Sequence, residues 1–187
     1  MVNSEPTLEP AVIWFTGLSG AGKSTIAREV CTRLLATRAR VEYLDGDEIR
    51  SVFPNTGFTR PERDAHIRRV GFLASRLEHH GVLVICALIS PYLESRAYVR
   101  GLCRRFVEIH VSTPLNECER RDAKGLYKRA RRGEIANFTG IDDVYEPSAA
   151  PELRIDTSRM SVPAAADRVM AALAIDDCAA RVTRVAS

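Results

Sequence analysis

Residues 17–24 read GLSGAGKS and directly follow the apolar run AVIWFT. The stretch fits the pattern G-x-x-x-x-G-K-[ST], with Gly17, Gly22, Lys23 and Ser24 at the fixed positions. Glycines let backbone N–H groups curl around phosphate oxygens, and a helix that follows the loop directs its positive N-terminal end at the same anion. Lys23 would neutralise the β- and γ-phosphates of a nucleotide, and the Ser24 hydroxyl would ligate Mg²⁺. The stretch therefore predicts a site for nucleotide phosphates.

Two carboxylates follow the second apolar run, in the segment LDGDEIR. Asp45 and Asp47 would lie at the carboxyl end of a strand, where ligands bind in open α/β sheets. Such carboxylates suit a base for a hydroxyl acceptor or an anchor for Mg²⁺, because in-line phosphoryl transfer needs a positioned nucleophile and neutralised charge. The pair D-G is also a common solvated turn. This segment alone leaves both interpretations open.

An arginine-rich segment, GFTRPERDAHIRR, comes next. It places Arg63, Arg68 and Arg69 on an expected helix, with the aromatic Phe58 just before it. An arginine fork suits a phosphate or sulfate group, and an exposed aromatic ring suits a nucleotide base. Arginines on a helix can equally form a solvated face.

A second basic segment covers residues 124–132, where five Lys and Arg side chains precede the next acid, Glu134. Such a cluster beside a phosphate site suits a lid that closes over a triphosphate and excludes water. A patch that binds nucleic acid is the alternative. The surrounding polar segment, residues 122–146, is long for a connection inside a compact domain, which favours a lid or binding loop.

Apolar runs alternate with helical patterns along the chain. Strands are expected at residues 11–16, 41–44, 82–87, 106–111 and 153–155. Helices are expected at residues 23–37, 61–80, 92–105, 114–122 and 162–173. This alternation implies crossover units and a parallel sheet covered on both faces. We therefore predict an α/β fold with a five-stranded parallel sheet, flanking helices and a charged lid.

The expected organisation is an arm at residues 1–10, a single domain at 11–175 and a frayed, alanine-rich tail at 176–187. With 187 residues and 45% hydrophobic content, the chain is long enough to bury a core. Its 27 basic and 24 acidic residues give a net charge of +3, a weak hint of an anionic partner. The five cysteines contain no CxxC pair and suit reduced thiols. The absence of a signal sequence or a spanning stretch leads us to expect a cytoplasmic protein.

Six segments in order resemble the adenylylsulfate kinase (APS kinase) family: GLSGAGKS, LDGDEIR, GFTRPERDAHIRR, LISPY, ERRDAKGLYKRARRGEI and NFTGIDDVYEP. The resemblance covers about residues 12–156. It implies a P-loop kinase that transfers the γ-phosphate of MgATP to the 3′-hydroxyl of adenosine 5′-phosphosulfate (APS), which gives PAPS in sulfate activation. It also implies a small-molecule substrate without a nucleic-acid or membrane partner, a homodimer, and an ATP sulfurylase as a partner.

The resemblance assigns roles to individual residues. Asp47 is implied as the base or orienting group, with Lys23 and Ser90 beside it as catalytic residues. Ser90 stands in the SPY motif, for which the family has a proposed phosphorylated intermediate, whereas direct in-line transfer to a held hydroxyl needs no covalent step. The implied ATP-binding residues are Gly17, Gly20, Ala21, Gly22, Lys23, Ser24 and Thr25, with Ser24 on the metal. The implied acceptor-binding residues are Asp47, Arg50, Phe58, Arg63, His66, Ile89, Ser90, Lys124, Asn137 and Phe138.

Within the acceptor set, Arg50 and Arg63 would grip the phosphosulfate end, and the rings of Phe58 and Phe138 would sandwich adenine. His66 and Glu48 stand where the family usually has asparagine. A kinase for the sugar hydroxyl of another nucleotide, such as a cytidine diphosphoramidate-type acceptor, therefore stays as an alternative. A nucleotide-dependent switch is less consistent with the sequence, which lacks a guanine-reading N-K-x-D stretch.

Overall fold

A five-stranded parallel β-sheet forms the centre of the molecule. The computed structural model describes residues 8–53 and 56–185, with side chains described up to residue 174. The strands follow the order β2-β3-β1-β4-β5, and every neighbouring pair is parallel. They are β1 (Val12–Thr16), β2 (Val41–Asp45), β3 (Leu83–Ala87), β4 (Phe106–Val111) and β5 (Leu153–Ile155). The predicted fold class is confirmed, and the strands agree with their expected bounds to within a residue.

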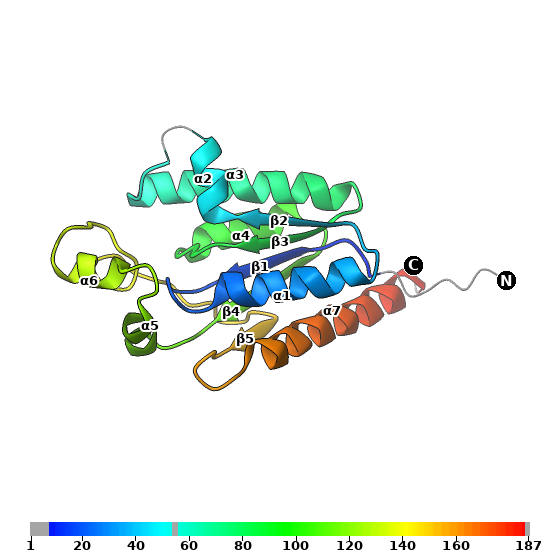
Figure 1. Cartoon of the computed structure of the whole chain (residues 1–187). Coiled ribbons are helices and arrows are strands. Elements are labelled where there is room, and N and C mark those ends of the chain that lie inside the picture. Colours follow the sequence, from blue (N-terminus) through cyan, green and yellow to red (C-terminus); the bar gives the residue numbers. More distant parts are fainter. Residues whose placement is uncertain (1–7, 54–55, 186–187) are drawn as a thin grey trace.

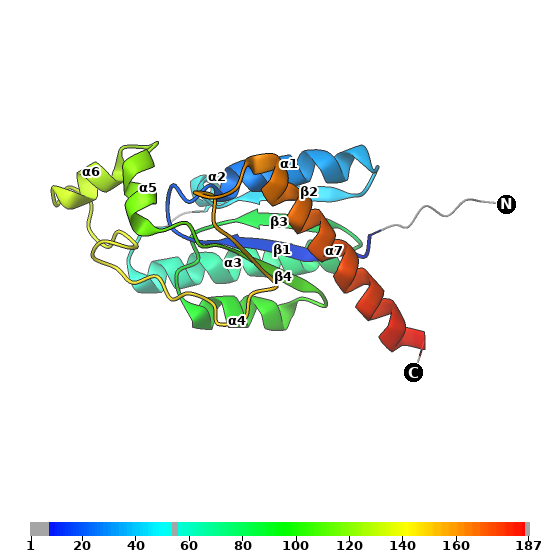
Figure 2. The same cartoon turned by 90° about the horizontal axis from the view of Figure 1, so that it is seen from below.

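Helices cover both faces of the sheet (Figures 1 and 2). The helices are α1 (Lys23–Ala36), α2 (Gly46–Val52), α3 (Arg60–His79), α4 (Leu93–Leu102), α5 (Leu115–Arg121), α6 (Leu126–Arg131) and α7 (Val162–Val185). α1 and α7 pack together on one face, and α3 and α4 pack together on the other. In β1, Ile13 and Phe15 join the α1/α7 layer, whereas Val12 and Trp14 join the α3/α4 layer. Burial on both faces explains why β1 and β3 are apolar over nearly their whole length.

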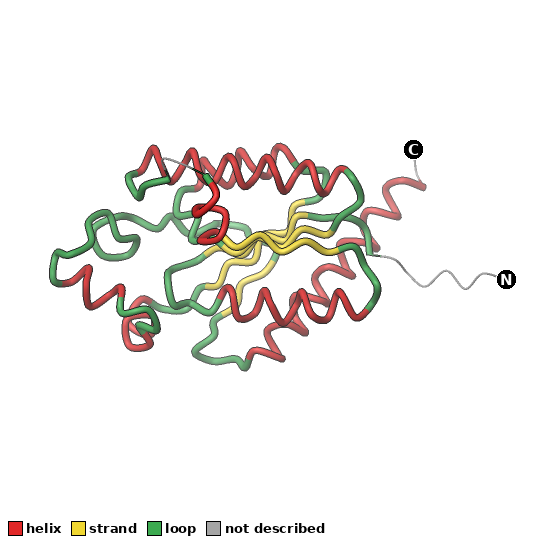
Figure 3. Tube along the Cα trace, turned by 45° about the horizontal axis from the view of Figure 1, so that its top comes forward, coloured by secondary structure: helices red, strands yellow, loops and turns green. Residues whose placement is uncertain are grey.

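The loops that carry the predicted chemistry gather beyond the carboxyl ends of the strands (Figure 3). α5 and α6 project from this end, while the start of β1 and the end of α7 lie at the opposite end (Figures 1 and 2). This arrangement concentrates the candidate site at one edge of the sheet, as expected for an open α/β fold.

α2 is a helix that the sequence patterns did not predict. It follows β2 directly, and the Asp45 carboxylate at its N-cap accepts a hydrogen bond from the Asp47 N–H at 2.9 Å. Such a cap satisfies one of the N–H groups that a helix start leaves unpaired. The D-G pair of this segment therefore starts a helix instead of a solvated turn.

Two helix ends differ from expectation. α4 ends at Leu102 because the buried Glu78 carboxylate binds the N–H groups of Arg104 and Arg105, at 3.4 and 3.2 Å, and leads the chain into β4. α7 continues beyond the expected end at Leu173, consistent with its alanine content, since alanine is the strongest helix former. Residues 1–7 of the expected arm and the side chains of the expected tail lie outside the described residues. Among the described helices, none has the length and apolar character needed to cross a membrane.

Candidate active site

A cavity of about 850 Å³ lies at the carboxyl edge of the sheet, between the glycine loop, α2, the start of α3 and the segment that contains α6. Most of the predicted site residues line it together: Gly20, Gly22, Lys23, Ser24, Thr25, Asp47, Arg50, Phe58, Arg63, His66, Ile89, Ser90, Lys124 and Phe138. Three others, Gly17, Ala21 and Asn137, lie outside the lining. Residues that are far apart in the sequence thus converge on one cavity.

Gly17 and Ala21 support the glycine loop from behind. Gly17 has a φ of 142°, and a Cβ atom there would lie 2.4 Å from the Val111 carbonyl oxygen. Only glycine fits this approach without moving the backbone. The Ala21 side chain is buried, and its carbonyl oxygen accepts hydrogen bonds from the hydroxyls of Thr113 at 3.0 Å and Thr157 at 2.9 Å. These contacts fix the shape of the loop.

Lys23 is the first residue of α1 and is almost fully buried. Its Nζ donates hydrogen bonds to the carbonyl oxygens of Gly17 at 2.9 Å and Leu18 at 2.7 Å. Burial lowers the pKa of Lys23 to about 8, although the nearby charge of Asp47 favours the protonated form. An anion that replaced the two carbonyl oxygens would stabilise the protonated form of Lys23 more strongly than they do.

Ser24 and Asp45 line the same cavity and offer a hydroxyl and a carboxylate oxygen. Among the described residues, no cluster of three His, Cys, Asp or Glu side chains could hold a metal ion. Mg²⁺ keeps several waters and usually binds through one or two protein oxygens together with substrate phosphates. The sparse oxygen donors at this edge therefore fit Mg²⁺.

Asp47 lies in the first turn of α2, and its side chain is mostly exposed. Its Oδ2 accepts a hydrogen bond from the Nζ of Lys124 at 2.7 Å, which forms an ion pair across the cavity. The pair joins the predicted base to the segment expected to act as a lid. Because both side chains are exposed, the pair adds little stability and can separate readily.

Arg50 and Arg63 flank the ring of Phe58, with guanidinium carbons 4.7 and 5.4 Å from the ring centre. Burial lowers the pKa of both arginines, and repulsion from Arg63 lowers that of Arg50 further. Arg63 donates to the carbonyl oxygens of Phe58 at 2.8 Å and Asn137 at 2.6 Å. Its remaining N–H donors stay available for a ligand. Two neighbouring cations beside an aromatic ring make this end of the cavity suitable for an anion.

His66 is buried on α3, and neither ring nitrogen makes a hydrogen bond of normal geometry. Burial, followed by repulsion from Arg50, lowers the pKa of His66 to about 4. The imidazole is therefore neutral near pH 7 and carries one donor and one acceptor nitrogen. A buried polar side chain in a cavity wall whose ring nitrogens lack a hydrogen bond of normal geometry is suited to read a polar group of a ligand.

Ser90 forms part of the wall but directs its hydroxyl into a buried network. Its Oγ accepts a hydrogen bond from the Trp14 indole N–H at 2.9 Å and donates to the Thr16 hydroxyl at 3.0 Å. The backbone of Ser90 has a φ of 38°, in the left-handed region that non-glycine residues rarely adopt. These contacts give Ser90 a structural role in shaping the wall next to Ile89.

α6 lies within the predicted lid, and its tyrosine connects the two ends of the cavity. The Tyr127 hydroxyl donates to the carbonyl oxygen of Ser19 in the glycine loop at 2.9 Å. The Tyr127 ring meets the ring of Phe138 edge to face, with centroids 5.0 Å apart. The arginines of the segment pair mostly with local acids: Arg129 and Arg132 with Glu134, and Arg131 with Glu119.

A third part of the site comes from residues that the sequence patterns did not single out. Asp143 accepts hydrogen bonds from the Tyr92 hydroxyl at 2.9 and 3.1 Å, and its carboxylate lies 3.8 Å from Arg63. Asp142 accepts from the N–H groups of Asn137 at 2.7 Å and Phe138 at 2.5 Å. Tandem acids directly after the T-G-I turn were a signal for such loop anchors. The two carboxylates hold the Phe138 loop against the SPY segment.

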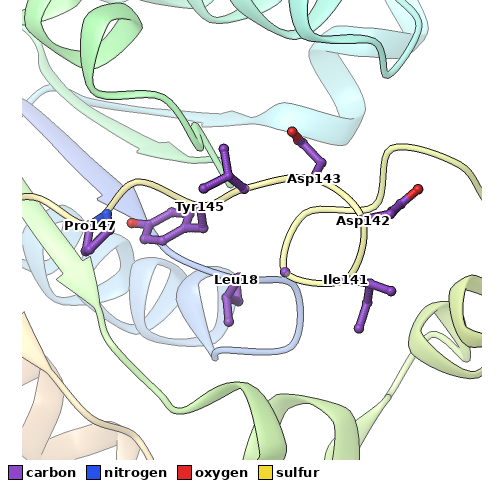
Figure 4. Close-up of a pocket in the computed structure, with 8 residues that line it drawn as sticks. Leu18, Ile141, Asp142, Asp143, Tyr145 and Pro147 are labelled. Carbon is purple, nitrogen blue, oxygen red and sulfur yellow. The ribbon is translucent and has the colours of Figure 1, made fainter.

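A second cavity of about 510 Å³ lies beside this loop (Figure 4). Its lining comprises Leu18, Gly140, Ile141, Asp142, Asp143, Val144, Tyr145 and Pro147. None of the predicted site residues belongs to it, and the Asp143 carboxylate in its wall is already engaged by Tyr92. The first cavity therefore remains the candidate active site.

Comparison with known proteins gives a consistent result. A family model described as adenylylsulphate kinase matches residues 9–156. Adenylyl-sulfate kinase from Chloroflexus aurantiacus is 50% identical over 163 residues, which cover 87% of this chain and 88% of the relative. The enzyme of the same name from Microcystis aeruginosa is 52% identical over 146 residues, covering 78% and 81%.

A solved structure agrees in fold and sequence. The APS kinase of Mycobacterium tuberculosis, in complex with AMPPNP and APS, superposes with a TM-score of 0.85 at 40% identity and covers 90% of this chain and 99% of its own. The matched residues 9–156 include the glycine loop, the DGD segment and the segment that contains α6. The chain belongs to the adenylylsulfate kinase family.

Proposed function

We propose that the protein transfers the γ-phosphate of ATP to the 3′-hydroxyl of APS, which yields PAPS and ADP. The observation that carries this function is the convergence of Lys23, Asp47 and the Arg50–Phe58–Arg63 group on one cavity. At one end of the cavity, Lys23 is suited to bind a polyphosphate. At the other end, Arg50 and Arg63 are suited to bind a second anion. Asp47 stands on α2 between these groups in the chain and is close enough to Lys23 for its charge to favour the ammonium form.

In the proposed mechanism, Lys23 leaves the carbonyl oxygens of the loop and binds the β- and γ-phosphates. The Asp47 carboxylate accepts the proton of the 3′-hydroxyl as that oxygen bonds to the γ-phosphorus and the bond to the ADP oxygen breaks. Before this step Asp47 must exchange its contact with Lys124 for the hydroxyl. Released Lys124 then lies beside the acceptor, where its charge favours the developing anion.

Ser24 and Asp45 would hold Mg²⁺, which supplies neutralisation of the phosphate charge when it is bound. Two residues of the proposed lid line the cavity. Tyr127 contacts the glycine loop, and Phe138 lies on the acceptor side. With the lid in place, water is excluded and the acceptor hydroxyl becomes the favoured nucleophile. APS itself would come from an enzyme of the ATP sulfurylase class.

A homodimer is part of the proposal. Large apolar side chains on the α3/α4 face, Phe72, Leu93 and Tyr98, are about half exposed, which is typical of a surface that contacts another chain. Light scattering coupled to size exclusion measures the state directly. A dimer that becomes monomeric in the Phe72→Glu variant is expected, and a monomeric wild type would refute it.

The acceptor identity is tested by ADP release from MgATP with APS, cytidine nucleotides, adenosine 5′-phosphate or no acceptor. Turnover confined to APS is the expected result. His66 gives a specific reason to include the cytidine nucleotides, because its two ring nitrogens are without normal hydrogen bonds in the cavity wall. Faster turnover with one of them would replace APS as the acceptor and leave the phosphoryl-transfer chemistry unchanged.

A further inference from the structure

Tyr43 connects the strand β2 to the polar groups at the edge of the nucleotide site. It lies two residues before the end of the strand, half-buried against the layer formed by α1 and α7. Its hydroxyl donates a hydrogen bond to Oδ2 of Asp45 at 3.3 Å. The phenol therefore contacts one of the two residues that offer oxygen donors to a cation at this edge.

The Asp45 carboxylate is held through both of its oxygens. Oδ1 accepts from the Asp47 N–H at 2.9 Å, and Oδ2 accepts from Tyr43. Contacts on both oxygens fix the plane of the carboxylate, whereas a single contact would leave it free to rotate. The same carboxylate caps α2, the helix that carries Asp47 and Arg50. The orientation of Asp45 thus affects the metal side and the acceptor side of the cavity.

The direction of the protons in this network follows from the available donors. A carboxylate only accepts, so the single phenolic proton of Tyr43 is donated to Asp45. The remaining lone pairs of the Asp45 oxygens stay available, and lone pairs are what a cation requires of a ligand.

We propose that Tyr43 is a positioning residue that orients the Asp45 carboxylate for the divalent cation that accompanies ATP. The inference rests on the proposed function, in which Asp45 and Ser24 hold Mg²⁺. Tyr43 does not line the cavity and acts only through Asp45. Its effect must therefore appear in the contribution of Mg²⁺ to nucleotide binding and not in binding of the nucleotide alone.

The test compares the affinity for AMPPNP of the full chain and of Tyr43→Phe, measured by calorimetry with saturating Mg²⁺ and again with EDTA. Tyr43→Phe removes one hydroxyl and keeps the ring packing. We expect the factor by which Mg²⁺ increases the affinity for AMPPNP to fall about three- to tenfold, because a long hydrogen bond to a charged group is lost. The affinity measured in EDTA should stay unchanged. Tyr98→Phe is the matched control, because it removes a phenol hydroxyl on α4, outside the cavity lining, and keeps the ring that contacts Arg68 and belongs to the proposed dimer surface.

Each outcome has a distinct meaning. An unchanged Mg²⁺ effect in Tyr43→Phe, or equal losses with Mg²⁺ and with EDTA, would overturn the positioning role and leave Tyr43 as a packing residue. Wild-type binding that is insensitive to Mg²⁺ would instead contradict the metal part of the proposed function. In a double-mutant cycle, Tyr43→Phe should cost little once Asp45→Asn is present, since the hydroxyl acts through that carboxylate. Independent losses in the cycle would also overturn the inference.

Discussion

Lys23 should take up a proton when a nucleotide binds. The ammonium is buried, and this burial lowers its pKa to about 8 in the free protein. In the proposed complex the carbonyl oxygens of Gly17 and Leu18 are replaced by phosphate oxygens that carry full negative charge. Such anions favour the protonated lysine and raise its pKa. Nucleotide binding and protonation of Lys23 are therefore coupled.

The size of the effect follows from the two pKa values. With a pKa of about 8 in the free protein and of at least 10.5 in the complex, uptake is about 0.1 proton at pH 7, about 0.5 at pH 8 and about 0.9 at pH 9. Binding takes up protons and does not release them at any pH in this range, because Lys23 is protonated to a greater extent in the complex than in the free protein. Nucleotide affinity must consequently fall as the pH rises above 8, by a factor that approaches about ten per pH unit.

Calorimetric titration with AMPPNP and Mg²⁺ in buffers of different ionisation enthalpy measures the number of protons directly. Lys23→Met provides the reference, because it retains the nucleotide's own protonation change and lacks the ammonium. Lys128→Met is a matched control, since Lys128 is an exposed lysine on α6 outside the cavity lining and should leave the uptake intact. Uptake near zero at pH 9, or the same uptake in Lys23→Met as in the wild type, would refute the assignment of Lys23 as the buried phosphate ligand.

Three further predictions concern individual side chains. Asp47→Ala should lower kcat by at least about a hundredfold while AMPPNP affinity changes little, as ADP release and calorimetry would show; near-normal turnover would remove Asp47 as the base. Ser90→Ala should keep kcat within about threefold and lower thermal stability, because the Trp14 indole loses its acceptor at a cost of about 1–2 kcal/mol; abolished turnover in a folded variant would support a phosphorylated intermediate. Phe138→Ala should weaken APS binding far more than AMPPNP binding, and equal losses measured by calorimetry would place the ring elsewhere; some loss of stability is expected because the contact with Tyr127 disappears.

The sheet and the phosphate loop were predictable because their signals are local. The strands β1 and β3 are buried on both faces, so each appears as an apolar run that can be located without knowledge of its neighbours. The glycine loop is equally local, since its fixed glycines, Lys23 and Ser24 all lie within residues 17–24. The resemblance to a family then supplied acceptor residues that periodicity does not indicate.

The remaining details depend on contacts between distant segments. α2 forms because Asp45 caps it, a choice between turn and helix that D-G alone leaves open. The roles of Tyr127 and Asp143 arise from partners more than fifty residues away in the sequence, at Ser19 and Tyr92. Even Arg63, which the sequence placed in the site, proved to bind backbone carbonyl oxygens as well as to face the cavity. Such multiple contacts become visible only when the chain is folded.

Tyr127 has a consequence for how the two substrates influence each other. It contacts the Ser19 carbonyl on the nucleotide side and the Phe138 ring on the acceptor side. A ligand that shifts this residue from one side alters the free energy of binding on the other. Thermodynamic reciprocity then requires ATP to change the affinity for the acceptor by the same factor as the acceptor changes the affinity for ATP. A single aromatic side chain thus couples the affinities for the two substrates by the same factor, whichever of them binds first.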